Sequence, residues 1–266
     1  MSDVEELVRT ATEAAVTNIT LDSPANRNAL SSTLVRQLRE ALDAAGADPD
    51  VRAVVLTHTG GTFCAGADLG EALNRGLTPE EATAEVGAAM SQLMRSFLEL
   101  SKPVIVVLDG HVRAGGLGLV GAADIVLAGP ASTFALTESR LGLAPSIISV
   151  VLLAKMTARA AGRYFLTGET FDAPAAVAAG LITASADTAE DLQAQVDAVL
   201  GGVRKASPQG LAASKALTTA ALLDGFDEAT AARAAESMAL FSSEEAREGM
   251  QAFLGKRPPS WAASAQ

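Results

Sequence analysis

Short apolar runs that each end in glycine constrain the fold of this chain more than any other feature of its sequence. VRAVVLTHTG at 51–60, KPVIVVLDG at 102–110 and ADIVLAG at 123–129 share this form, which is typical of buried strands followed by turns. AVTNITL at 15–21 alternates like a further strand, and TLVRQLREALDAAG at 33–46 has the period of a helix. Apolar strands that alternate with helices predict an α/β core rather than a β-sandwich.

The chain beyond residue 157 is rich in alanine and has a helical pattern. It predicts helices over 189–202, 210–223 and 227–240, and the Ser-Ser-Glu-Glu start of SSEEAREGMQAFLGKR predicts a last helix ending before Pro258. Apolar faces in LAASKALTTAALL and AARAAESMALF indicate burial against the core or against another subunit. We place the division between the core and the helical region after residue 195, giving 1–195 and 196–266.

Composition excludes several classes of function. The chain is 49% hydrophobic and carries a formal net charge of −11, which disfavours general binding to nucleic acid or to an anionic membrane surface. Cys64 is the one cysteine, and His58 and His111 lack a metal-binding spacing, so we expect no disulfide and no metal. The acidic start MSDVEELVRT has no apolar run and no stretch is long enough to span a membrane, so we expect a cytoplasmic protein.

Two loops of small residues are candidate anion sites, FCAGADL at 63–69 and VRAGGLG at 112–118. Each would follow a strand and precede a helix, where glycine and alanine let backbone N–H groups approach a ligand closely. Small residues serve tight packing equally well, so one such loop alone indicates little. The second loop has neither the dinucleotide-binding nor the P-loop spacing, and no GxSxG motif surrounds any serine nearby.

Glu138 is the candidate acid or base. It lies among apolar residues in TFALTESRLGLAP, about twenty positions after the second loop. Partial desolvation of a carboxylate raises its pKa toward the range useful for proton transfer. The alternative is a surface ion pair with Arg140.

Four segments carry a resemblance to a known family: LTHTGGTFCAGADL, KPVIVVLDGHVRAGGLGLVGAADIVLAGPASTFALTESRLGLAP, GRYFLTGETFDAPAAVAAGLI and SSEEAREGMQAFLGKRPP. In this order and spacing the chain resembles the enoyl-CoA hydratase/isomerase (crotonase) family from about residue 13 to 259. The resemblance implies a spiral core of ββα units, a C-terminal helical trimerisation region, and a homotrimer or homohexamer. It implies an acyl-CoA thioester as substrate, with coenzyme A as part of that substrate and no separate cofactor.

The resemblance also implies roles for individual residues. The backbone N–H groups of Ala67 and Gly115 would form an oxyanion hole for the thioester carbonyl, which becomes enolate-like during reaction. Contacts to CoA are implied for Asn26, Arg27, Ala29, Ala65, Ala67, Asp68 and Leu69. Phe253 and Lys256 match residues that reach the CoA of the same or a neighbouring subunit, although Lys256 would equally suit a solvated helix end.

One departure from the family pattern concerns the acid–base pair. Hydratases of this family commonly hold water between two glutamates; Glu138 matches the second, and the first position falls on Gly118. The segment PSIIS at 145–149 also replaces a glycine-rich turn.

Three interpretations follow from this departure. The chain could be a hydratase similar to methylglutaconyl-CoA hydratases, in which Ser146, Ser149 or His111 helps to hold water, and we favour this one. It could be a Δ3-Δ2 enoyl-CoA isomerase, which needs only one carboxylate and the oxyanion hole, or a non-catalytic acyl-CoA binder. For the hydratase we further hypothesise that Arg113 binds the distal carboxylate of a glutaconyl-type acyl group, the alternative being a surface arginine.

Overall fold

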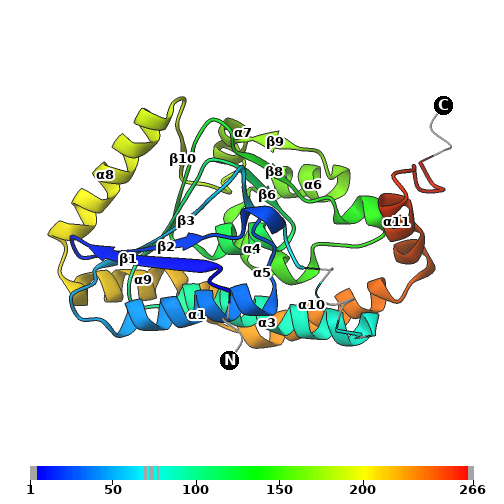
Figure 1. Cartoon of the computed structure of the whole chain (residues 1–266), viewed down its shortest axis with the longest axis horizontal. Helices are drawn as coiled ribbons and strands as arrows, with labels where there is room; N and C mark the ends of the chain where they lie inside the picture. Colours follow the sequence, from blue (N-terminus) through cyan, green and yellow to red (C-terminus); the bar gives the residue numbers. More distant parts are fainter. Residues whose placement is uncertain (1–4, 69–70, 72–74, 77, 263–266) are drawn as a thin grey trace.

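The computed structural model describes residues 5–68, 71, 75–76 and 78–262, which form two sheets surrounded by helices (Figure 1). The larger sheet has the strand order β1-β2-β3-β5-β7-β10 and the smaller one β4-β6-β8-β9. The strands of the larger sheet are β1 (Val8–Glu13), β2 (Val16–Leu21), β3 (Ala53–His58), β5 (Val104–Leu108), β7 (Ile125–Ala128) and β10 (Ala184–Ser185). Those of the smaller sheet are β4 (Thr62–Cys64), β6 (His111–Arg113), β8 (Thr133–Ala135) and β9 (Phe171–Asp172).

The helices follow the strands and then dominate the second half of the chain. The first half contains η1 (Pro24–Asn26), α1 (Ser32–Ala47), α3 (Pro79–Glu99), α4 (Gly115–Ala122), η2 (Glu138–Leu141) and α5 (Ser146–Lys155). The second half contains α6 (Ala158–Thr167), α7 (Ala173–Ala178), α8 (Ala189–Lys205), α9 (Pro208–Leu223), α10 (Phe226–Phe241) and α11 (Glu244–Leu254). No helix in the described part of the chain is long and apolar enough to cross a membrane.

The central strands of the larger sheet are buried on both faces, as their apolar sequences predict. Strands β2, β3, β5 and β7 pair in parallel. Along β3, Val54 and Leu56 face the core built with α1 and α3, whereas Ala53 and Val55 face the side chains of α8. Figure 1 shows α1 and α3 along one side of this sheet and α8 on another. This alternation confirms the α/β core.

The two sheets are built by one repeated unit. β3 is followed by β4, β5 by β6, and β7 by β8, so that each long strand of the larger sheet leads into a short strand of the smaller one. Helix α4 follows β6, and the short helix η2 follows β8. The predicted ββα core is therefore confirmed.

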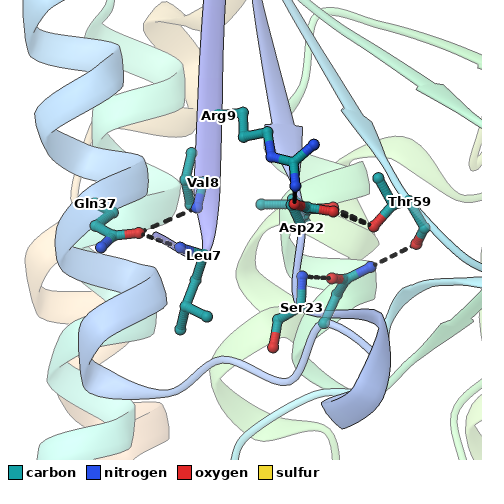
Figure 2. Close-up of polar contacts among 9 residues, drawn as sticks. Leu7, Val8, Arg9, Asp22, Ser23, Gln37 and Thr59 are labelled. Carbon is teal, nitrogen blue, oxygen red and sulfur yellow. Dashed lines mark hydrogen bonds and ion pairs between the residues drawn. The ribbon is translucent and has the colours of Figure 1, made fainter. Parts of the chain in front are cut away.

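Strand β1 was not predicted, because little in its sequence marks it. Five of its six residues are exposed, so it has no apolar alternation. The turn into β2 uses Ala14 and Ala15 at φ of 48° and 63°, where glycine or asparagine would be the usual signal. The strand start is fixed from outside the sheet: the side-chain oxygen of Gln37 accepts hydrogen bonds from the N–H groups of Leu7 and Val8 at 2.8 and 3.0 Å (Figure 2).

The expected division at residue 195 falls inside α8. Leu192, on one side of it, and Val196 and Leu200, on the other, all pack on the same face of the larger sheet. Helix α9 is tied to the core by Lys215, whose Nζ donates to the carbonyl oxygen of Phe97 at 2.6 Å and pairs with Asp124 at 2.7 Å. Burial lowers the pKa of Lys215, and the facing carboxylate opposes that effect.

Candidate active site

Three short strands bring the predicted site segments to one edge of the smaller sheet. β4, β6 and β8 lie side by side and run parallel, with Cys64 opposite Val112 and Arg113 opposite Ala135. The carboxyl ends of parallel strands meet at the same edge of a sheet. The segments that follow them, which begin at residues 65, 114 and 136, therefore converge there.

The two small-residue loops are in direct contact. Gly66 has φ of +95°, and a methyl group added to it would lie 2.7 Å from the Cβ of Ala114 and 3.4 Å from the backbone nitrogen of Gly115. Only glycine allows both this conformation and this approach. The close contact places Gly66, the residue before Ala67, against Gly115, the first residue of helix α4.

Both expected oxyanion donors have free N–H groups in the described part of the chain. Leu30 forms an isolated β-bridge with Ala67: its N–H donates to the carbonyl oxygen of Gly66 at 2.7 Å, and its carbonyl oxygen accepts from the N–H of Asp68. This pattern uses neither the N–H of Ala67 nor any acceptor for it. The N–H of Gly115 belongs to the first turn of α4, where no intrahelical acceptor exists. Two such donors beside a helix N-terminus can stabilise a developing negative charge.

Glu138 begins η2, three residues after the end of β8, the strand that pairs with β6. Its Oε2 atom is buried and has no hydrogen-bond partner among the described residues. Burial raises the pKa of this carboxyl to about 7, partly offset by a backbone hydrogen bond. Arg140 does not pair with it, since its Nε donates to the carbonyl oxygen of Thr167 at 2.9 Å. A carboxyl that is buried, unpaired and close to neutrality in its pKa can both take and give a proton.

Gly118 lacks a side chain, and its surroundings leave no room for one. A methyl group added there would lie 2.7 Å from Cγ2 of Ile148, and 3.1 and 3.3 Å from the sulfur atoms of Met90 and Met94. These side chains come from α5 and α3, so the position of the family's first glutamate is filled by apolar packing. Of the expected acid–base pair, the chain retains the carboxylate of Glu138.

The residues expected to hold water in place of that glutamate have other partners. Ser149 donates its hydroxyl to the carbonyl oxygen of Ser146 at 2.6 Å, and the Ser146 hydroxyl lies 3.5 Å from the carbonyl oxygen of Ala144. His111 is exposed at the start of β6, beside the hydroxyl of Thr133, at the strand end opposite the loops.

The hypothesis that Arg113 binds a distal carboxylate finds no support in this arrangement. Its guanidinium donates to the carbonyl oxygens of Val112 and Thr133 at 2.9 and 2.8 Å, and to the Thr133 hydroxyl at 2.9 Å. Thr133 pairs with His111, two residues before Arg113, so the side chain lies back along the strands and away from the Gly115 loop. Partial burial lowers its pKa, with no carboxylate partner among the described residues.

Residues 26–29, the segment after β2 that the resemblance expects to contact CoA, lie against the first loop; they are called the CoA segment below. The N–H of Ala65 donates to the carbonyl oxygen of Arg27 at 3.1 Å, and the side-chain amide of Asn26 donates to Asp68 at 2.7 Å. Ala29 is buried beside this contact. Leu69 lies outside the described residues. The structure thus assembles Asn26, Arg27, Ala29, Ala65 and Asp68 from two distant parts of the sequence.

Asn28 is a positioning residue that the sequence did not reveal. It is fully buried, its side-chain oxygen accepts from the N–H of Ser23 at 2.7 Å, and its amide donates to the carbonyl oxygens of Thr59 and Thr62 at 3.1 and 2.8 Å. It adopts φ of 51°, which asparagine tolerates better than most residues. Its side chain therefore holds the CoA segment against the strand that leads into the first loop.

The turn before Asn28 is fixed by charge as well. Asp22 pairs with Arg9 and accepts a hydrogen bond from the hydroxyl of Thr59 at 2.7 Å, as Figure 2 shows. These contacts bind the end of β2 to the end of β3, from which both the CoA segment and the first loop depart.

Phe253 and Lys256 lie apart from these contacts at the end of α11. Phe253 is 70% exposed, and Lys256 is exposed in a left-handed conformation at φ of 49°. In the described part of the chain no hydrogen bond or ion pair joins either of them to residues 26–29. No group of three or more histidine, cysteine, aspartate or glutamate residues there could hold a metal ion. Cys64 is buried, which raises the pKa of its thiol to about 12.

Comparison with known proteins agrees with this fold. The sequence model of the enoyl-CoA hydratase/isomerase family matches residues 11–264. The chain is 31% identical to 2,3-dehydroadipyl-CoA hydratase of Escherichia coli (strain K12), over 91% of this chain and 93% of that protein. It is 55% identical to an enoyl-CoA hydratase from Mycobacterium avium of known crystal structure, with a TM-score of 0.90 over 97% of this chain and 100% of the other.

A crystal structure of an enoyl-CoA hydratase/isomerase from Marinobacter aquaeolei matches with 30% identity and a TM-score of 0.75, over 96% of this chain and 99% of the other. Sequence and fold agree over almost the whole length in each case. The chain therefore belongs to the enoyl-CoA hydratase/isomerase family.

Proposed function

We propose that this chain is an enoyl-CoA hydratase that adds water to an α,β-unsaturated acyl-CoA thioester with a single carboxylate, that of Glu138. The observation that carries the proposal is the buried, unpartnered Oε2 of Glu138, which follows the strand next to the Gly115 loop. A buried polar atom without a partner is costly, and such atoms are typical of sites that await a ligand. The free N–H groups of Ala67 and Gly115 supply the complementary electrophilic site.

The reaction needs one proton to move twice. The thioester oxygen accepts hydrogen bonds from the N–H groups of Ala67 and Gly115, which polarise the C2–C3 double bond. The Glu138 carboxylate takes a proton from water while the water oxygen bonds to C3, and the electron pair of the double bond passes to the thioester oxygen as an enolate. The Glu138 carboxylic acid then gives the same proton to C2, so that water is added to one face. A pKa of about 7 suits both steps.

The packing around Gly118 favours a second candidate, a Δ3-Δ2 enoyl-CoA isomerase. Ile148 and Met90 make this wall apolar, and an isomerase needs no water there. Glu138 would take a proton from C2 of a 3-enoyl thioester, and the same oxyanion hole would hold the dienolate. Return of that proton to C4 shifts the double bond without any change in mass.

One experiment separates these candidates. The purified protein and Glu138→Gln are incubated with crotonyl-CoA, 3-methylglutaconyl-CoA and a 3-enoyl-CoA, and the products are followed by mass. Addition of water that is lost in the variant supports the hydratase, and mass-neutral migration that is lost in the variant supports the isomerase. Tight CoA-ester binding without turnover by either protein would instead identify a non-catalytic acyl-CoA binder.

The substrate class is an acyl-CoA of fatty-acid or leucine-type breakdown. The E. coli relative is named for a dicarboxylyl thioester, but in this chain the Arg113 guanidinium is turned away from the loops. For CoA itself we propose contacts from Asn26, Arg27, Ala29, Ala65, Asp68 and Leu69, with Phe253 and Lys256 reaching the same or a neighbouring subunit.

Assembly into a homotrimer or homohexamer through the C-terminal helices completes the proposal. Large apolar side chains remain exposed on these helices: Leu217 is 81% exposed on α9, and Leu254 is 76% exposed at the end of α11. Exposed apolar side chains of this size are typical of surfaces that another protein covers.

A further inference from the structure

The short helix that carries Glu138 is held on two sides. On one side, the hydroxyl of Ser139 and the Nε of Arg140 donate to the carbonyl oxygens of Leu166 and Thr167, at 3.3 and 2.9 Å, at the end of α6. On the other side lies α11, from the far end of the chain. Figure 1 shows α11, in red, at the end of the molecule where α10 also ends.

The contact between η2 and α11 is made by backbone on both partners. A methyl group added to Gly249 of α11 would lie 2.5 Å from the carbonyl oxygen of Leu141 and 2.6 Å from its carbonyl carbon. A methyl group added to Gly142, directly after η2, would lie 2.7 to 2.9 Å from the backbone of Glu245 and Ala246. Two glycines therefore let the two backbones touch, and neither could gain a side chain unless a backbone moved.

Leu141 belongs to the same helical turn as Glu138. The N–H of Leu143 donates to the carbonyl oxygen of Glu138 at 3.0 Å, and that of Gly142 donates to it as well. Because η2 has only four residues, a shift of Leu141 is transmitted to Glu138 through this hydrogen-bonded turn.

We propose that α11 positions the Glu138 carboxylate through this contact, and that Gly249 is the residue on which the position depends. The helix thereby has a role in catalysis beyond the assembly expected of the C-terminal region. The inference rests on the proposed function only in taking Glu138 as the catalytic group.

The test is Gly249→Ala, with Gly162→Ala as its matched control. Gly162 is a glycine of α6, the other helix that packs on η2, but a methyl group added to it meets no atom within 4 Å. Misplacement of a catalytic group by about 1 Å can cost 100-fold in rate. We expect kcat of Gly249→Ala to fall about 10- to 100-fold with KM nearly unchanged, and Gly162→Ala to keep the wild-type kcat.

A second readout does not depend on turnover. The titration of the Glu138 carboxyl is followed by infrared difference spectroscopy, with Glu138→Gln to assign the band. Displacement of η2 admits water to the carboxyl, so its pKa falls from about 7 toward its ordinary value in Gly249→Ala alone. Among the charged groups on the flanking helices, Arg163 of α6 pairs with Glu169 and Glu248 of α11 pairs with Arg257 at 2.7 Å. The others, Arg159 of α6 and Glu244, Glu245 and Arg247 of α11, are exposed to solvent.

Should Gly249→Ala fail to fold, Ser243→Ala loosens α11 without adding an atom to the contact. The Ser243 hydroxyl accepts from the N–H of Ala246 at 3.1 Å and caps the helix, a contact worth about 1 kcal/mol. A smaller change of kcat and of the Glu138 titration in the same direction would support the proposal. Wild-type kcat and an unshifted titration in whichever variant folds would overturn it.

These outcomes also separate the two proposals. If the wild-type protein turns over no enoyl-CoA, the proposed function fails, yet a shifted titration in Gly249→Ala would still support the positioning role. If the wild type is active and both variants match it in kcat and titration, only the positioning role fails.

Discussion

Burial of Glu138 has two opposing effects: it raises the pKa of the carboxyl, so that the group can hold a proton near neutral pH, and it destabilises the folded state when the carboxyl is charged. Its pKa in the folded chain is about 7, against 4.5 as the ordinary value. The folded state therefore binds the proton more tightly than the unfolded state does. Its contribution to stability is complete below pH 4.5 and is lost as the pH rises through about 7.

The first prediction follows from this sign. Glu138→Gln keeps a neutral side chain at every pH, so it is expected to stabilise the protein at pH 8 by on the order of 2 kcal/mol while abolishing turnover. At pH 4 the two proteins should unfold at the same denaturant concentration. Urea unfolding at both pH values measures the difference; equal stability at pH 8 would contradict the buried carboxylate.

A second prediction concerns the rate of the wild-type enzyme. Because the carboxylate form of Glu138 takes the first proton, kcat/KM is expected to fall as the pH drops below about 7. The pH dependence of kcat/KM with crotonyl-CoA measures this. A rate that stays constant down to pH 5 would show that another group is the base.

Gly118 carries the third prediction. A methyl group there meets Ile148 and Met90, so Gly118→Ala is expected to destabilise the fold by about 1–3 kcal/mol, although alanine favours a helix. Gly201→Ala in α8 is the matched control, because its added methyl group meets no atom within 4 Å. It should instead stabilise the protein by about 0.5–1 kcal/mol. Urea unfolding measures the free energy of unfolding of both variants. Equal effects would show that the space beside Gly118 can accept a methyl group.

At the scale of elements, α9 is attached to the sheet through one buried charge pair. Lys215 pairs with Asp124, which also accepts a hydrogen bond from the N–H of Val104 at 2.7 Å. Removal of one partner leaves the other charge buried and unpaired, which costs about 3–5 kcal/mol. Lys215→Met is therefore expected to lose this much in urea unfolding, whereas Lys205→Met, at the exposed end of α8, should lose almost nothing. A loss below 1 kcal/mol would contradict the role of this pair.

The elements that the sequence predicted are those marked by a local signal, such as an apolar run that ends in glycine or an alanine-rich stretch. The strands around Val54, Ile105 and Val126 are apolar runs that each lead to a glycine, and the helices from 189 onward are rich in alanine; all of them lie within a few residues of the expected places. Strand β1 could not be predicted, because it is an exposed edge strand whose turn is made by two alanines. Its place depends on Gln37, a contact across 29 residues that local sequence does not encode.

The sequence motifs predict the loops of small residues that form the backbone of the site. They do not predict how the surrounding side chains pack. The N–H groups of Ala67 and Gly115, to which the resemblance assigns the oxyanion hole, have no acceptor among the described residues. The direction of the Arg113 side chain, the apolar filling beside Gly118 and the contact at Gly249 all depend on residues distant in the sequence. No local pattern reports such contacts, which is why the sequence did not reveal that the Arg113 guanidinium donates to the carbonyl oxygens of Val112 and Thr133.

At the scale of the whole molecule, helix α11 has one face in the core and one exposed end. The inner face of α11 touches the turn that carries Glu138, and its end exposes Phe253 and Leu254. If a neighbouring subunit covers these side chains, assembly and the position of Glu138 are coupled through one helix. We expect sedimentation velocity to give the mass of a trimer or a hexamer, and a monomer at micromolar concentration would contradict this.

Hydration of crotonyl-CoA in D2O tests the role of the single carboxylate most directly. The wild-type enzyme is expected to form 3-hydroxybutyryl-CoA with one deuterium at C2, delivered to the same face as the new hydroxyl, and Glu138→Gln is expected to form none. Product from Glu138→Gln at the wild-type rate, or deuterium delivered to the opposite face, would contradict transfer of the water proton by Glu138.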